Sequence, residues 1–111
     1  MKNKLLVAVG SIAFLTACNA PKGNEMQWFD HAVKTSGHQL LYMAEQLKNE
    51  PDTACFPRSI KEGKYRLEHP TDWTSGFYPG SMWLAYELTG DEALAKEARK
   101  YTNRLQDMQY Y

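Results

Sequence analysis

The segment of residues 74–89 restricts the possible folds of this chain more than any other, because it has helical spacing yet is apolar on more than one side. Its large apolar side chains are Phe77, Met82, Trp83, Tyr86 and Leu88. A helix that is hydrophobic around most of its circumference is buried on several faces. The neighbouring segments do not offer enough apolar surface to cover it. We therefore expect this helix to be one wall of a larger helical assembly that continues beyond Tyr111.

Two further helices are predicted around this wall. Residues 27–48 carry apolar side chains at spacings of three and four, with an interruption at Gly37 and a stop before Pro51. Residues 92–109 carry an apolar stripe made of Leu94, Ala98, Tyr101, Leu105 and Met108. Between the second and third helices, Gly90 suits a left-handed helix end and Asp91 suits the next N-cap. These two helices are therefore predicted to form an αα-hairpin.

Residues 51–72 are predicted to form a loop region, since they contain several prolines and little helical periodicity. Within this region, residues 60–67 are predicted to form a small hairpin around Glu62 and Gly63. A long loop of this kind inside a helical protein is often functional.

The N-terminus has the pattern of an export signal. Lys2 and Lys4 flank the start of an apolar run, residues 5–15, that is too short to span a bilayer. Residues 15–18 read LTAC, which resembles the lipobox of bacterial lipoproteins, where the cysteine thiol carries the lipid. We expect a signal peptide at 1–17, lipidation at Cys18, a polar tether at 18–26 and a folded domain at 27–111. The alternative is an ordinary signal peptide followed by a chance cysteine.

Charge and cysteine usage exclude several other classes of protein. The formal net charge is zero, with no basic stripe of the kind that nucleic acid requires. Cys55 has no partner once Cys18 is lipidated, and we interpret it as a buried small residue and not a reactive thiol. His31, His38 and His69 lack metal-ligand spacing, so no metal site and no cofactor are expected.

Residues 72–91 carry the strongest resemblance to known proteins. They read DWTSGFYPGSMWLAYELTGD, and upstream residues 56–59 and 63–65 read FPRS and GKY. This combination resembles the unsaturated glucuronyl hydrolases, family 88 of the glycoside hydrolases. The resemblance implies an all-α (α/α)6 barrel, of which residues 27–111 are the N-terminal part. It also implies hydration of the C4–C5 double bond of terminal unsaturated uronic acids on oligosaccharides that polysaccharide lyases release.

The resemblance also implies roles for individual residues. Trp73 is expected to line the pocket and contact the unsaturated sugar, with a core tryptophan that anchors the turn as the alternative. Arg58 is a candidate for binding the uronate carboxylate, and its alternative is a loop-bracing arginine paired with a local acid or carbonyl. Asp72 is expected to be a turn and N-cap residue and Trp83 a core residue. No catalytic residue is assigned, because the family's catalytic aspartates are expected beyond Tyr111.

Two other functions remain open from the sequence. One is a glycan-binding helical lipoprotein, although no internal repeat supports it. The other is an unsaturated rhamnogalacturonyl hydrolase, which shares the barrel and has similar chemistry. The expected partners are acidic unsaturated oligosaccharides, for the enzyme, and a bacterial membrane through the N-terminal lipid, either on the periplasmic side or at the outer membrane.

Overall fold

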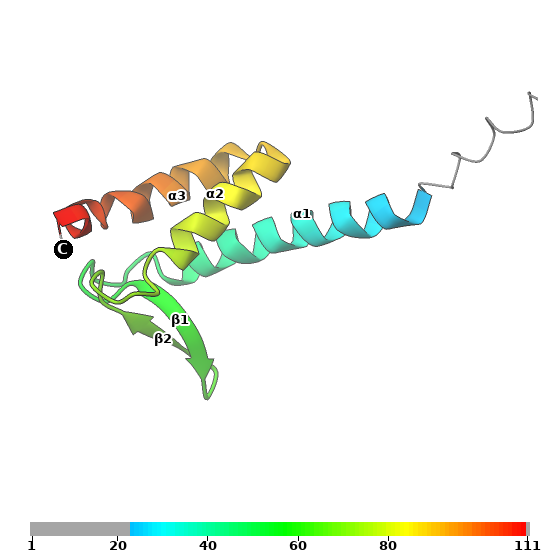
Figure 1. Cartoon of the computed structure of the whole chain (residues 1–111). Coiled ribbons are helices and arrows are strands. Elements are labelled where there is room, and N and C mark those ends of the chain that lie inside the picture. The colour runs from blue at the N-terminus through cyan, green and yellow to red at the C-terminus, as the bar shows by residue number, and fades with distance from the viewer. Residues whose placement is uncertain (1–22, 111) are drawn as a thin grey trace, which may run out of the picture.

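The computed structural model describes residues 23–110, which are mostly helical and include one two-stranded sheet (Figure 1). In chain order the elements are α1 (Gly23–Gln46), β1 (Phe56–Lys61), β2 (Lys64–Glu68), α2 (Phe77–Thr89), α3 (Glu92–Asn103) and the 3-10 helix η1 (Gln106–Tyr110). The predicted signal peptide, Cys18 and the first part of the predicted tether lie outside the described residues. The helical fold class is confirmed, with the small sheet added to it.

Helix α1 is longer and more continuous than predicted. It begins at Gly23, before the predicted helix start at residue 27 and within the segment predicted as the tether, 18–26. Glu25, Met26 and Gln27 are good helix formers, which explains the earlier start. Gly37 does not interrupt the helix, because it is a buried contact point. A Cβ added there would lie 3.3 Å from Cδ1 of Leu94 on α3.

The two strands form an antiparallel hairpin over the end of α1 (Figure 1). Both residues of its connecting turn have positive φ, 52° at Glu62 and 74° at Gly63. Positive φ at both central positions matches the twist of the flanking strands and makes such a two-residue connection favourable. The predicted hairpin is therefore confirmed, with longer strands than the sequence indicated.

Helices α2 and α3 form the predicted αα-hairpin. Gly90 has a left-handed φ of 69° and its N–H donates to the carbonyl of Tyr86. Asp91 caps α3 by accepting a hydrogen bond from the N–H of Ala93 at 2.9 Å. The predicted end of the third helix is wrong, since the α-helix stops at Asn103 and a 3-10 turn follows. Threonine and asparagine in its last turn have low helix propensity, which favours this tightening.

The core lies where α1, α2, α3 and the first residue of β1 meet. Its buried members are Ala44, Cys55, Phe56, Tyr78, Met82, Ala98 and Tyr101. The ring of Tyr101 packs edge-on against both other core aromatics, at centroid distances of 5.8 Å to Phe56 and 4.9 Å to Tyr78. Trp83 packs against this cluster while half-buried, with its indole N–H donating to Thr102 at 3.0 Å. None of the helices described is long and apolar enough to cross a membrane.

Candidate functional site

The chain between β2 and α2 forms a tightly hydrogen-bonded turn. Oδ1 of Asp72 accepts hydrogen bonds from both the backbone N–H of Thr74, at 2.8 Å, and its side-chain hydroxyl. The hydroxyl of Ser75 donates to the carbonyl of Pro70 at 2.8 Å. Both Thr74 and Ser75 are buried. These bonds hold residues 72–76 as turns, which is why α2 begins at Phe77 and not at the predicted residue 74.

Trp73 lies on the outside of this turn. Its side chain is 74% exposed, although its flanking residues Asp72 and Thr74 are hydrogen-bonded to each other. The edge of one ring meets the face of the other between Trp73 and Phe77, at a centroid distance of 5.7 Å and an interplanar angle of 86°. Within the described residues Trp73 is therefore not a core residue. An exposed indole on a fixed turn is suited to stacking against the apolar face of a pyranose.

The carboxylate of Asp72 stabilises the turn and is not suited to donating a proton. The two hydrogen bonds from Thr74 lower the pKa of the Asp72 carboxyl below its ordinary value, and the positive charges of Arg58 and Arg66 lower it further. A general acid at neutral pH needs a raised pKa instead. The expectation that Asp72 is a turn residue is confirmed, while the N-cap of α2 is Gly76.

Arg58 extends from β1 towards two carboxylates. Its Nη1 lies 3.4 Å from Oε1 of Glu68 on β2 and 3.6 Å from Oδ2 of Asp72 in the turn. Arg66 also contacts Glu68, with 3.0 Å between its Nε and Oε1. The structure thus brings Arg58 close to the turn that carries Trp73. It also pairs the arginine with local acids, which is the arrangement expected of a loop-bracing residue.

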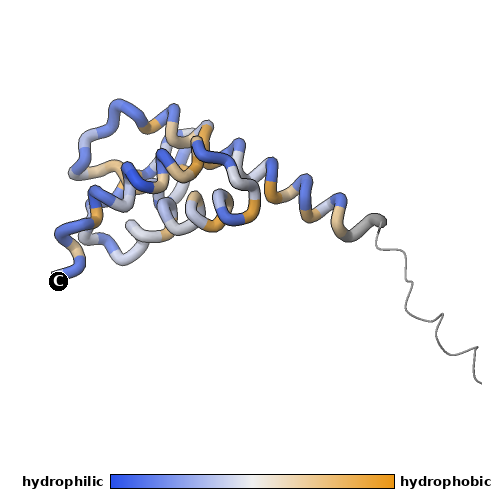
Figure 2. Tube along the Cα trace, turned by 90° about the horizontal axis from the view of Figure 1, so that it is seen from above, coloured by the Kyte–Doolittle hydropathy of each residue, from blue (hydrophilic) through white to orange (hydrophobic). Residues whose placement is uncertain are grey.

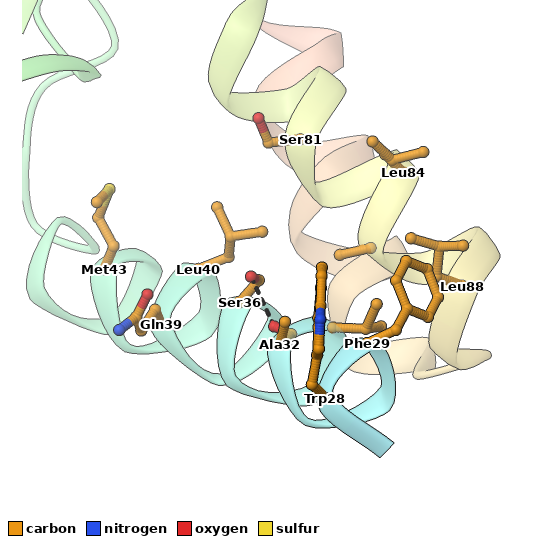
Figure 3. Close-up of a pocket in the computed structure, with 12 residues that line it drawn as sticks. Trp28, Phe29, Ala32, Ser36, Gln39, Leu40, Met43, Ser81, Leu84 and Leu88 are labelled. Carbon is orange, nitrogen blue, oxygen red and sulfur yellow. Dashed lines mark hydrogen bonds between the residues drawn. The ribbon is translucent and has the colours of Figure 1, made fainter. Parts of the chain in front are cut away.

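Two hollows flank α2. A smaller one of about 230 Å³ lies beside the turn and is lined by Arg58, Tyr65, Phe77 and neighbouring residues. A larger groove of about 500 Å³ runs between α1 and α2. Figure 3 shows Trp28 and Phe29 of α1 opposite Leu88 of α2 at one end of this groove. The sequence indicated excess apolar surface on α2, but not that α1 supplies the aromatic side of the same groove.

The histidines and Cys55 are not part of a metal site or a reactive cluster in the part of the chain that the structure describes. Across residues 23–110 no group of histidine, cysteine and acidic side chains is arranged to hold a metal ion. His31, His38 and His69 are exposed. Cys55 is fully buried, and burial raises the pKa of its thiol, so the interpretation as a structural residue is confirmed. Cys18 lies outside the described residues.

The curated proteins that resemble this chain carry closely related names. No protein-family model matches the chain. Curated relatives named unsaturated glucuronyl hydrolase are 47% identical over 67 residues in Formosa agariphila and 47% identical over 57 residues in a Bacillus species. These matches cover 57% and 50% of this chain but 16% and 15% of the relatives. A Streptococcus pneumoniae relative named unsaturated chondroitin disaccharide hydrolase is 31% identical over 74 residues, 67% of this chain and 17% of its own length.

A solved structure agrees with these relatives. The crystal structure of an unsaturated glucuronyl hydrolase specific for heparin superposes with a TM-score of 0.66 at 40% identity. The match covers 77% of this chain and 22% of that chain. The helices and the exposed aromatic turn thus resemble part of an enzyme with the (α/α)6 barrel fold. Within that class, the chain belongs to the unsaturated glucuronyl hydrolase family. It spans only a small part of the full length of these relatives.

Proposed function

We propose that the chain is part of an enzyme that hydrates the C4–C5 double bond of terminal unsaturated uronic acids on acidic oligosaccharides. The observation that carries this proposal is the agreement between named relatives at 47% identity and the structural neighbour at 40% identity. In this chemistry the vinyl ether is protonated and water adds to C5. The resulting hemiketal opens, and the glycosidic bond breaks.

The contribution of this chain to that reaction is sugar binding and not proton transfer. Trp73 presents an indole face for the unsaturated ring, and Phe77 supports the indole from its edge. The proton donor must be a carboxyl group whose pKa is raised towards neutrality. Asp72 has a lowered pKa and does not qualify. We propose that the catalytic aspartates belong to polypeptide beyond Tyr111, as the family resemblance implies.

The direct test uses the gene product that contains this chain and an unsaturated chondroitin disaccharide as substrate. Hydrolysis removes the ultraviolet absorbance of the double bond, and we expect that loss. Binding of the disaccharide without loss of absorbance would favour the glycan-binding lipoprotein. Faster turnover of an unsaturated rhamnogalacturonyl disaccharide would favour the sister family. The coding sequence also discriminates, since His-Asp-x-Gly-Phe within a few codons of Tyr111 is expected only for the enzyme.

The role of Trp73 is tested by substitution in the same enzyme. An aromatic contact contributes about 0.5–1.5 kcal/mol, so Trp73→Ala is expected to raise KM by about 2- to 10-fold. Trp73→Phe keeps an aromatic face, and its KM is expected to lie between those of the unaltered enzyme and Trp73→Ala. Equal KM values for all three proteins would remove Trp73 from the binding surface.

We also propose that the protein is a lipoprotein, anchored to a bacterial membrane through Cys18 and exposed to the periplasm or at the outer membrane. The LTAC sequence after a short apolar run supports this anchor. Metabolic labelling with radioactive palmitate is expected to label the protein, and Cys18→Ser is expected to abolish the label. Labelling that persists in Cys18→Ser would contradict the proposal.

A further inference from the structure

Arg58 occupies an irregular position in the β1–β2 hairpin. In the strand register Pro57 pairs with Leu67 and Ser59 pairs with Arg66, so Arg58 is the extra residue on its strand. Such a β-bulge bends the strand and redirects the side chain of the extra residue, and bulges are common next to functional sites. Here the redirected side chain reaches out of the hairpin towards the turn that carries Trp73.

The guanidinium of Arg58 joins two elements through their carboxylates. It contacts Glu68 on β2 at 3.4 Å and Asp72 in the turn at 3.6 Å. Both carboxylate side chains are largely shielded from solvent, with exposed fractions of 19% and 20%. The positive charge of Arg58 is thus already shared between two acids. This arrangement leaves it poorly suited to take a sugar carboxylate as well.

The two carboxylate oxygens of Asp72 contact different partners. Oδ2 faces Arg58, while Oδ1 accepts both hydrogen bonds from Thr74. The residues immediately before and after Trp73 are therefore linked to each other and, through Arg58, to the hairpin. We propose that Arg58 is a positioning residue for Trp73, and that it sets the orientation of the indole and does not contact the sugar. This inference rests on the proposed function for its consequence in catalysis.

The contact is suited to orienting the turn more than to stabilising the fold. The side chain of Arg58 is 36% exposed, and ion pairs at such positions contribute little to the free energy of folding. Loss of Arg58 is therefore expected to leave the fold in place and to free the turn.

The experiment observes Trp73 directly. The gene product that contains this chain carries 5-fluorotryptophan and is followed by fluorine NMR, and the resonances of Trp28, Trp73 and Trp83 are assigned by single Trp→Phe substitutions. Arg58→Ala is expected to shift or broaden the Trp73 resonance while the resonances of Trp28 and Trp83 stay unchanged. Arg66→Ala is the matched control, because it removes a cation paired with Glu68 but not with Asp72. It is expected to leave all three resonances in place.

A second variant keeps the result decisive if Arg58→Ala disturbs the whole fold. Asp72→Asn retains an oxygen that accepts from Thr74 but loses the charge that attracts Arg58. It is expected to move the Trp73 resonance alone. A Trp73 resonance that is unchanged in Arg58→Ala, or unchanged in Asp72→Asn when Arg58→Ala is globally altered, would overturn the proposal.

The consequence for the enzyme is tested separately. In the gene product that contains the chain, Arg58→Ala is expected to raise KM for the unsaturated chondroitin disaccharide severalfold with little change in kcat, and Arg58→Lys to restore part of the loss. A raised KM with an unmoved Trp73 resonance would instead make Arg58 a direct ligand of the sugar. Because the NMR measurement needs no turnover, failure of the positioning role is distinguishable from failure of the proposed activity.

Discussion

At the residue scale, Asp72 links the geometry of the turn to pH. Its pKa is lowered chiefly by Thr74, from an ordinary value of 3.8. A carboxyl with a lowered folded pKa adds stability above its unfolded pKa, and that stability is lost as pH falls through the folded value. We expect Thr74→Val, which removes the donating hydroxyl, to flatten the pH dependence of the unfolding free energy below pH 3.8. Urea titrations of the gene product that contains this chain, over a pH series, measure this effect. An unchanged slope of the unfolding free energy against pH would contradict the prediction.

The hydroxyl of Tyr78 makes a hydrogen bond between α2 and α1. Its side chain is buried, its hydroxyl donates to the carbonyl of Leu40 at 3.0 Å, and burial raises its pKa. We expect Tyr78→Phe to lower the free energy of unfolding by about 1–2 kcal/mol, because the carbonyl loses its donor. The matched control is Tyr42→Phe on the exposed face of α1, which is expected to have almost no effect. The measurement is made in the gene product that contains this chain, and equal urea midpoints for the two variants would count against this role.

The sequence predicts which of these residues matter better than it predicts their surroundings. Trp73 and Arg58 were candidates because of residue type and motif. The exposure of Trp73 depends on how Thr74 and Ser75 turn inward, and the partners of Arg58 depend on a bulge. A bulge is defined by the strand opposite, so local sequence does not reveal it.

At the scale of elements, features that depend on local backbone preference were predictable. Gly90 and the Glu62–Gly63 turn adopt the left-handed conformations expected of them. The starts of α1 and α2 and the C-terminal end of α3 were not, since each depends on small propensity differences or on side-chain hydrogen bonds such as those of Asp72. The continuity of α1 through Gly37 also depends on a tertiary contact, with Leu94.

Two glycines beside α2 provide a matched test of this reasoning. Gly90 has a φ of 69°, whereas Gly76 has a φ of −75°, and neither has an atom within 4 Å of an added Cβ. We expect Gly90→Ala to lower the free energy of unfolding by about 1 kcal/mol through backbone strain. Gly76→Ala is expected to be neutral or slightly stabilising, since alanine restricts the unfolded chain. Chemical denaturation of the gene product that contains this chain compares the two variants, and equal losses of stability would show that backbone conformation is not the cause.

At the scale of the whole molecule, the described residues leave large apolar side chains uncovered. In Figure 2 hydrophobic positions recur along α1 as well as along α2. Trp28, Leu84 and Leu88 are 66%, 58% and 50% exposed, and all three line the groove between these helices. This uncovered wall is what the all-round apolar pattern of α2 predicted. The sequence did not reveal how α1 crosses α2, because that contact depends on residues far apart in the chain.

The uncovered groove leads to a prediction for the chain when it is purified alone. Exposed contiguous apolar surface binds the dye ANS, and a helical wall without its full cover lacks cooperative packing. We expect strong ANS fluorescence and a broad thermal transition by far-UV circular dichroism. The double variant Leu84→Gln and Leu88→Gln is expected to reduce the dye signal severalfold without loss of helix, because both side chains are already half or more exposed. Ile60→Gln, at an equally exposed apolar residue of the hairpin outside this groove, is expected to leave the signal nearly unchanged. A sharp transition with little dye binding by the unaltered chain would show that its own residues close the groove.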